Sequence, residues 1–355
     1  MIIRSKAPLR IGLAGGGTDL ESYSKKYGGA VLNATVSMFA YCTIIPTDDG
    51  RIVIKAYDNG NSMNIESTPE IKPQGDKLIL HCGVYNRIVK DYNGGKPLSF
   101  IMSTSNDAPV GSGLGTSSTM VVAILKAFDR WLNLNLDDYT LAGLAYDIER
   151  KDLKLAGGKQ DQYAAVFGGF NFMEFRENGS TLVNTLRLER SYINELESSF
   201  VLYYVGKSRS SDSQQLVLTK NIIEHQIKGA QSDNSSTLDA MNGIKEYAYK
   251  MKDCILTGDM KGIGECLKQG WEQKKRTSSI VSNTELEKTI SFALSHGAEA
   301  VKVSGAGGGG FLLLFCDPVN RQELIYEMSS LEGKVFPLHF SSRGAESWVI
   351  NKVKA

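Results

Sequence analysis

Glycines gather at a few places in this chain of 355 residues, and this clustering restricts its fold more than any other feature. The 36 glycines include four clusters: Gly15 to Gly17, an alternating set at 111, 113 and 115, the pair at 157 and 158, and Gly305 with Gly307 to Gly310. Glycine adopts positive φ without strain and lets another backbone or a ligand approach closely. We therefore expect the functional site at these clusters.

The segment from Pro109 to Ser118 places three alternate glycines directly before a helical pattern. In that pattern apolar residues recur three and four positions apart, at Val121, Ile124, Leu125, Phe128 and Leu132. A helix N-terminus offers unpaired N–H donors and partial positive charge, which suit phosphate oxygens. Helix capping is the alternative role for the hydroxyls at 116–118. The sequence thus predicts a phosphate-binding loop made of Pro109, Gly111, Ser112, Gly113, Leu114, Gly115, Thr116, Ser117 and Ser118.

Other nucleotide-binding and metal-binding patterns are not met. A Walker A loop needs a glycine five residues before its Gly-Lys-Ser, whereas the triplet at Gly206 has Val201 there. The dinucleotide pattern fails after Gly15 because position 20 is leucine. The four histidines lack metal-ligand spacing, and the five cysteines form no CxxC pair.

Composition and length exclude several classes of protein. Lys and Arg total 40 against 39 Asp and Glu, and this near-zero net charge argues against nucleic-acid and membrane-surface partners. No apolar run approaches the roughly 20 residues that span a bilayer, so we expect a cytoplasmic protein. The length favours two domains, which we place at 1–190 and 191–355. Whether the protein forms a homodimer stays open.

Periodicity predicts where the strands and helices lie. Residues 2–57 are typical of strands separated by turns, with Arg10 opposite the apolar face of its strand. A second amphipathic helix carries Leu141, Leu144, Ala145 and Ile148. In the second half we expect strands at 200–205, 300–303, 311–315 and 335–340, and a helical stretch over 213–273 with a loop at 230–236.

Three motifs together resemble those of the GHMP kinase family. They are KAPLRI at 6–11 with GGGTD at 15–19, the phosphate-binding loop, and KVSGAGGGG at 302–310. The resemblance implies an α+β fold of two domains, the first like domain 2 of ribosomal protein S5 and the second ferredoxin-like, with the active site in the cleft between them. It also implies a small-molecule kinase that uses ATP and Mg²⁺.

The resemblance also assigns catalytic roles. Asp161, twelve residues after Glu149, matches the family aspartate that orients or deprotonates the acceptor hydroxyl. Arg10 matches the basic residue that accompanies this aspartate and offsets charge. Ser117 and Glu149 match the magnesium positions, and one hydroxyl and one carboxylate beside the phosphates suffice for that ion.

The N-terminal motif indicates the acceptor. Gly17, Thr18 and Asp19 match the family's sugar-binding positions, and AGGGTD resembles the heptose kinase branch. That branch phosphorylates the anomeric hydroxyl of D-glycero-D-manno-heptose 7-phosphate to give the 1,7-bisphosphate. L-fucose, galactose and mevalonate-type acceptors stay alternatives within the family. A non-catalytic sensor of sugar and nucleotide is the alternative from another class.

A phosphorylated acceptor requires basic residues to bind its phosphate. Lys207 and Arg209, directly after a predicted strand, are one candidate pair, and the run from Lys274 through Lys275 to Arg276 is another. An ordinary solvent-exposed position is an equal alternative for both clusters. Gly307 and Gly308 are expected on the substrate side, with contacts through the backbone.

Overall fold

The computed structural model describes residues 1–73, 75, 77–109, 111–206, 221, 222, 225, 228 and 235–351. Its larger sheet runs in the order β12-β1-β2-β5-β3-β4, and β6 and β7 extend it from the first half of β2. The strands are β1 (Ile2–Ala14), β2 (Gly29–Pro46), β3 (Arg51–Ala56), β4 (Asn61–Glu66), β5 (Phe100–Asn106), β6 (Phe170–Phe175), β7 (Thr181–Leu186) and β12 (Glu346–Ile350).

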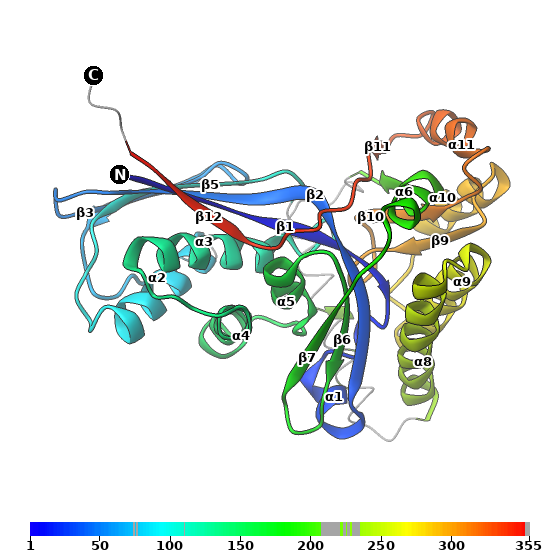
Figure 1. Cartoon of the computed structure of the whole chain (residues 1–355), viewed down its shortest axis with the longest axis horizontal. Helices are drawn as coiled ribbons and strands as arrows, with labels where there is room; N and C mark the ends of the chain where they lie inside the picture. Colours follow the sequence, from blue (N-terminus) through cyan, green and yellow to red (C-terminus); the bar gives the residue numbers. More distant parts are fainter. Residues whose placement is uncertain are drawn as a thin grey trace.

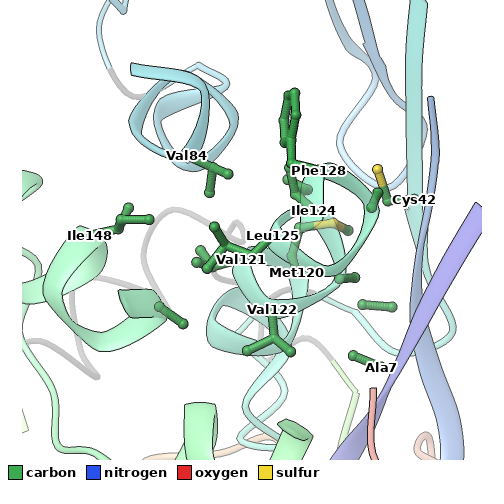
Figure 2. Close-up of a cluster of buried hydrophobic side chains, with 14 of the residues drawn as sticks. Ala7, Cys42, Val84, Met120, Val121, Val122, Ile124, Leu125, Phe128 and Ile148 are labelled. Carbon is green, nitrogen blue, oxygen red and sulfur yellow. The ribbon is translucent and has the colours of Figure 1, made fainter. Parts of the chain in front are cut away.

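A layer of helices covers one face of this sheet (Figure 1). They are α2 (Ile79–Tyr92), α3 (Thr116–Leu132), α4 (Asp138–Asp147), the π-helix η1 (Ile148–Asp152) and α5 (Gln160–Phe167). Helix α3 lies at the centre, and its predicted apolar face is buried between Ala7 and Cys42 of the sheet and Val84 and Ile148 of the neighbouring helices (Figure 2). This packing holds the N-terminus of α3 in a fixed position.

The smaller sheet is antiparallel, in the order β11-β8-β10-β9. Alternate residues of β8 and β10 enter two different cores, as the two-residue repeat of a strand requires. One core is shared with α8, α9, β1 and β2, and therefore joins the two sheets. The other core lies under α10 and α11. The elements are α6 (Arg190–Ser199), β8 (Phe200–Tyr204), α8 (Ser235–Thr257), α9 (Met260–Thr277), α10 (Thr284–Ser295), β9 (Ala300–Val303), β10 (Phe311–Phe315), α11 (Arg321–Met328) and β11 (Lys334–Phe336).

The last described strand returns to the first sheet. Strand β12 pairs antiparallel with β1, with Val349 opposite Ile3, and the two run side by side in Figure 1. The first and last described strands therefore lie in the same sheet. A division at residue 190 stays a prediction. No described helix is long and apolar enough to span a membrane.

The structure corrects several predicted elements. A helix, α1 (Glu21–Tyr27), interrupts the region where only strands and turns were expected. Strand β11 ends at Phe336, before Pro337, which has no N–H to continue the ladder; Phe340 forms only an isolated bridge to Val36. Helix α8 already includes residues 235 and 236 of the predicted loop. Residues 230–234 lie outside the described residues.

Arg10 does not lie on an exposed strand face. Every residue of β1 from Ala7 to Ala14 is buried, and Arg10 itself is 4% exposed. Alternation predicts the face on which Arg10 lies but not its burial, because that face is covered too, by the segment that precedes α3 and by α5.

Candidate active site

The predicted phosphate-binding loop adopts the backbone that its glycines allow. Gly111, Gly113 and Gly115 have φ values of 78°, 84° and 79°. These positive angles are strained for residues with a Cβ, which accounts for glycine at alternate positions. Gly115 is the N-cap of α3 and provides no side-chain cap. The first amides of this 17-residue helix are therefore suited to phosphate oxygens.

A buried hydroxyl in the same loop lacks a partner. Ser112 is 1% exposed, and its Oγ forms no hydrogen bond within the described part of the chain. Buried polar atoms are nearly always paired in folded proteins. An unpaired hydroxyl here fits a loop that completes its hydrogen bonds with a ligand.

The C-terminal glycine motif and the residue that follows it pack onto the backbone of this loop. The Phe311 N–H donates to Ser112 O at 3.0 Å, and the Ser304 hydroxyl donates to Gly113 O at 3.0 Å. A Cβ on Gly305 would lie 2.7 Å from Gly113 Cα, so the close approach requires glycine. The two glycine motifs, almost 200 residues apart, form one interlocked unit.

Gly307 and Gly308 lie against the segment that precedes α10. The Gly308 N–H donates to Val281 O at 2.7 Å, and Asn283 Nδ2 donates to Gly308 O at 3.3 Å. A Cβ on Gly307 would lie 2.6 Å from Val281 O. The backbone N–H and carbonyl of Gly308 are therefore already hydrogen-bonded within the protein. A contact of Gly307 or Gly308 with substrate stays a prediction.

The Arg10 guanidinium connects Asp161 to the glycine loop. Its Nε and Nη2 lie 2.7 and 2.6 Å from Asp161 Oδ1. Its Nη1 donates to Gly113 O at 2.6 Å, and the Arg10 N–H donates to Leu114 O at 3.1 Å. One buried arginine therefore fixes both the loop backbone and the carboxylate.

Asp161 lies in the first turn of α5, directly over the glycine loop. A Cβ on Gly115 would be 3.2 Å from Asp161 Cγ. Both contacts from Arg10 use Oδ1, and no described group donates to Oδ2, while 23% of the side chain is exposed. The carboxylate has a fixed orientation and one oxygen available to accept a proton.

Asp19 is joined to the same unit through Gln160. Asp19 Oδ2 accepts from the Gln160 N–H, and Oδ1 accepts from Gln160 Nε2, each at 3.0 Å. Oδ1 also accepts from the Gly17 N–H at 3.0 Å. Since Gln160 precedes Asp161, the predicted substrate and catalytic aspartates share one rigid connection.

Thr18 has a structural role in the loop that contains the first glycine motif, residues 15–19. Its hydroxyl lies 2.8 Å from Gly15 O and 2.9 Å from Ala30 O, and accepts from the Ala30 N–H at 3.1 Å. These bonds occupy the hydroxyl and fasten the loop to β2. They position Gly17 and Asp19, which lie on either side of Thr18.

Glu149 lies on η1 and is 1% exposed. Gln162 Nε2 donates to Glu149 Oε2 at 2.5 Å and to Ser118 Oγ at 3.1 Å. Arg150 Nη1 lies 3.6 Å from Glu149 Oε1. The structure therefore connects Glu149 to the start of α3 through Gln162, at Ser118 rather than at the half-buried Ser117.

These residues fit a Mg²⁺ ion held mainly by nucleotide phosphates. The described residues contain no group of three or more His, Cys, Asp and Glu that could hold a metal by themselves. Mg²⁺ needs only one or two protein oxygens when phosphates and water supply the rest. Glu149 offers a carboxylate and Ser117 a hydroxyl. The buried Gln162 Oε1, which has no partner among the described residues, adds a further hard oxygen.

Two lysines from the second half of the chain reach the first glycine motif. Lys274 Nζ, from α9, donates to Gly16 O at 3.0 Å. Lys302 Nζ, from β9, donates to Gly12 O at 2.7 Å and to Leu13 O at 3.1 Å. Burial lowers the pKa of Lys274 to about 8 and that of Lys302 to about 7.

The other cations predicted to bind a substrate phosphate do not reach the first glycine motif or lie outside the described residues. Lys275 pairs with Glu272 at 2.8 Å, and Arg276 is exposed beside Gln273. Lys207 and Arg209 lie outside the described residues.

Three side chains of this site carry no functional prediction from sequence: Lys302, Gln160 and Gln162. A single lysine within the apolar strand AVKV was a usable signal for Lys302. For the glutamines the usable signal was the pair of polar side chains that flank Asp161.

Two protein-family models match this chain. The model of the GHMP kinases N terminal domain matches residues 79–169, and that of the GHMP kinases C terminal domain matches 251–333. The chain is 46% identical over 348 residues to a D-glycero-alpha-D-manno-heptose 7-phosphate kinase of Campylobacter jejuni, covering 98% of this chain and 99% of that protein.

Solved structures show the same fold. A crystal structure titled as a D-glycero-D-manno-heptose 1-phosphate kinase from Bacteroides thetaiotaomicron has a TM-score of 0.82 and 44% identity, and covers 99% of this chain and 100% of that one. The mevalonate kinase of Methanococcus jannaschii shares the fold at 19% identity, with a TM-score of 0.73 and coverage of 96% and 98%.

The fold and the glycine loop define a small-molecule kinase. The chain belongs to the GHMP kinase family. The predicted α+β fold and the predicted class of enzyme are confirmed, as is the resemblance to the heptose kinase branch. Members of this family use ATP as the phosphate donor.

Proposed function

We propose that this kinase transfers the γ-phosphoryl group of ATP to the anomeric hydroxyl of D-glycero-D-manno-heptose 7-phosphate, giving the 1,7-bisphosphate. The observation that carries the proposal is the 46% identity, over 98% of this chain, to the Campylobacter protein named D-glycero-alpha-D-manno-heptose 7-phosphate kinase. The Arg10–Asp161 pair beside the glycine loop supports it, because a non-catalytic sensor has no need of a carboxylate held ready to accept a proton.

In the proposed mechanism Asp161 Oδ2 receives the proton of the acceptor hydroxyl. The hydroxyl oxygen forms a bond to the γ-phosphorus while the bond from that phosphorus to the bridging oxygen breaks, and ADP leaves with that electron pair. Arg10 holds Asp161 Oδ1, so that the free oxygen keeps one orientation throughout. Positioning of this kind supplies much of the rate enhancement in phosphoryl transfer.

The glycine loop would bind the nucleotide phosphates. The amides at the start of α3 and the unpaired Ser112 hydroxyl offer donors for their oxygens. Ser117 and Glu149 would hold Mg²⁺, which when bound offsets the negative charge of those phosphates. Gln162 keeps the buried Glu149 carboxylate oriented toward this end of α3.

An acceptor panel tests the proposal. The purified chain is incubated with Mg·ATP and one of four acceptors: D-glycero-D-manno-heptose 7-phosphate, L-fucose, galactose or mevalonate. We expect release of ADP that depends on the heptose phosphate and is at least about a hundredfold slower with the other three. Turnover of another acceptor alone would replace the proposed substrate while keeping the kinase. No turnover of the heptose phosphate would contradict the proposal.

The position of phosphorylation is tested separately, because the two similar proteins carry different names. The Campylobacter protein is named a heptose 7-phosphate kinase, and the solved structure is titled a heptose 1-phosphate kinase. Including D-glycero-D-manno-heptose 1-phosphate in the panel distinguishes the two. We expect turnover of the 7-phosphate and none of the 1-phosphate, since the proposal places the anomeric hydroxyl at Asp161.

A further inference from the structure

Lys274 and Lys302 approach one short stretch of backbone from two different elements. Lys274, on α9, bonds to the carbonyl of Gly16, and Lys302, on β9, bonds to the carbonyls of Gly12 and Leu13. Each ammonium group has three N–H donors, and the described hydrogen bonds occupy one of them on Lys274 and two on Lys302. Both lysines therefore keep a donor for a further partner.

Neither lysine forms an ion pair within the described part of the chain. The charged groups that act on the pKa of Lys274 are Asp19 and Arg10, and those that act on the pKa of Lys302 are Lys274 and Arg10. Asp19 already accepts three hydrogen bonds from Gly17 and Gln160. The Asp161 Oδ1 is likewise occupied by Arg10. Three basic groups thus meet two engaged carboxylates, which leaves an excess of positive charge when both lysines are protonated.

This excess of positive charge destabilises the folded protein unless an opposite charge compensates for it. A buried ammonium group bonded only to neutral carbonyls loses its hydration without gaining a counter-charge. Lys274 is 7% exposed and lies on the same helix as Lys275, which has two carboxylates, Glu272 and Glu287, within 4 Å. The helix therefore carries one lysine neutralised at the surface and one held inside that forms no ion pair with a described residue.

The two lysines lie close to the groups assigned to the acceptor. A Cβ on Gly12 would be 3.9 Å from Lys302 Nζ and 4.0 Å from Gln160 Oε1, so the missing side chain leaves space between those two groups. Gln160 in turn holds Asp19 and precedes Asp161. An anion seated between the lysines would lie beside the proposed position of the acceptor.

We propose that Lys274 and Lys302 together form a phosphate-binding site, in which both ammonium groups contact a phosphoryl group of the bound ligands. The inference rests on the proposed function and extends it, since that function needs a cationic site for an acceptor that already carries a phosphate. The phosphoryl oxygens come either from the acceptor's own phosphate or from the transferring γ-phosphoryl group. Each ammonium then gains a charged partner and regains the stabilisation that burial removed.

Binding of inorganic phosphate to the full chain, without nucleotide, tests the site directly. By titration calorimetry, Lys274→Met and Lys302→Met should each weaken phosphate binding at least about tenfold, the loss of one charge-assisted contact. Lys275→Met is the matched control and should change it less than about twofold. Lys274→Arg keeps the charge and should retain more affinity than Lys274→Met. Circular dichroism checks that each variant is folded, and unchanged phosphate affinity in both methionine variants would overturn the proposal.

Steady-state kinetics distinguishes the two sources of phosphate. A rise in KM for the heptose phosphate with KM for ATP unchanged indicates the acceptor's own phosphate. A fall in kcat with both KM values unchanged indicates the transferring group. If the wild-type chain turns over no heptose phosphate, yet the methionine variants still lose phosphate affinity, the proposed function fails and the phosphate site stands.

Discussion

Arg10 contacts a single oxygen of Asp161: its Nε and Nη2 lie 2.7 and 2.6 Å from Oδ1, and Oδ2 receives no hydrogen bond from a described group. This asymmetry separates two tasks within one carboxylate. One oxygen fixes the side chain, and the other is available for the acceptor proton. The third guanidinium nitrogen reaches Gly113 O, so the same arginine sets the carboxylate in register with the glycine loop.

Asp161→Asn should lower kcat by about a hundredfold to ten-thousandfold, the range for loss of a general base, because the amide cannot take the proton. Binding of ATP to this variant should stay within about threefold, since the glycine loop is unchanged. Initial rates of ADP release and nucleotide titration measure the two effects. Asp152→Asn removes a comparable partner of an arginine, Arg87, at 2.6 Å on the surface, and should leave kcat within about twofold. Full activity of Asp161→Asn would remove Asp161 from the mechanism.

Gly113→Ala should destabilise the protein and weaken ATP binding together. Gly113 has φ of 84°, and an added Cβ would collide with the carbonyl of Ser304. Gly50 is a matched control, because its φ is 69° and an added Cβ would meet nothing within 4 Å. Gly50→Ala should lose only about 1–2 kcal/mol of unfolding free energy from backbone strain. Gly113→Ala should lose more and raise KM for ATP at least about tenfold. Equal losses in both variants would show that the interlocked glycine motifs do not matter.

Glu149→Gln should raise the Mg²⁺ concentration needed for half-maximal activity by about tenfold or more, because an amide is a weaker ligand for a hard cation. The hydrogen bond to Gln162 limits structural change, since the substituted side chain can still accept it. Activity is measured against Mg²⁺ at a fixed, saturating ATP concentration. Glu174→Gln, at a half-buried glutamate that accepts from Tyr249, is the control. An unchanged Mg²⁺ requirement would exclude Glu149 from the metal site.

Because of Lys274, the unfolding free energy of the ligand-free protein should increase as pH rises. Its pKa is about 8 in the folded chain and near 10.5 when exposed, so between those values the unfolded chain binds the proton that the folded chain has released. Unfolding free energy therefore increases with pH in this window, by up to roughly 3 kcal/mol in total. Lys274→Met removes the part of this gain that belongs to Lys274 and should be the more stable form at pH 7, where wild type carries the buried charge. Urea unfolding at pH 7 and pH 10 measures the difference, and Lys275→Met should behave like wild type. Lys302, whose pKa is about 7, contributes a gain of its own, so Lys274→Met should keep part of the rise. An equal gain in wild type and in Lys274→Met would contradict the assignment.

Local sequence patterns predict the parts of the site that depend on neighbouring residues. The glycine loop and the apolar face of α3 follow directly from spacing, because both are set by residues within one turn of each other. Asp161, Arg10 and Glu149 were assigned through the family resemblance. The Arg10–Asp161 contact joins β1 to α5 across 151 positions, and the contact of Glu149 with Gln162 joins η1 to α5. No periodicity in the sequence encodes such contacts.

Other features could not be predicted because they depend on tertiary packing. Arg10 is buried because other parts of the chain cover its strand on both faces, which alternation in one strand cannot show. The hydrogen bonds of Lys302 to Gly12 and Leu13 join residues 290 and 289 positions apart. Pairing of β12 with β1 has the same origin.

Phosphorus NMR of the product formed from Mg·ATP and D-glycero-D-manno-heptose 7-phosphate tests the central claim most directly. The account predicts a second sugar phosphate signal, coupled to the anomeric proton, that appears with wild type and is absent over the same period with Asp161→Asn. A new phosphate on any other carbon, or an anomeric phosphate formed equally fast by Asp161→Asn, would contradict it.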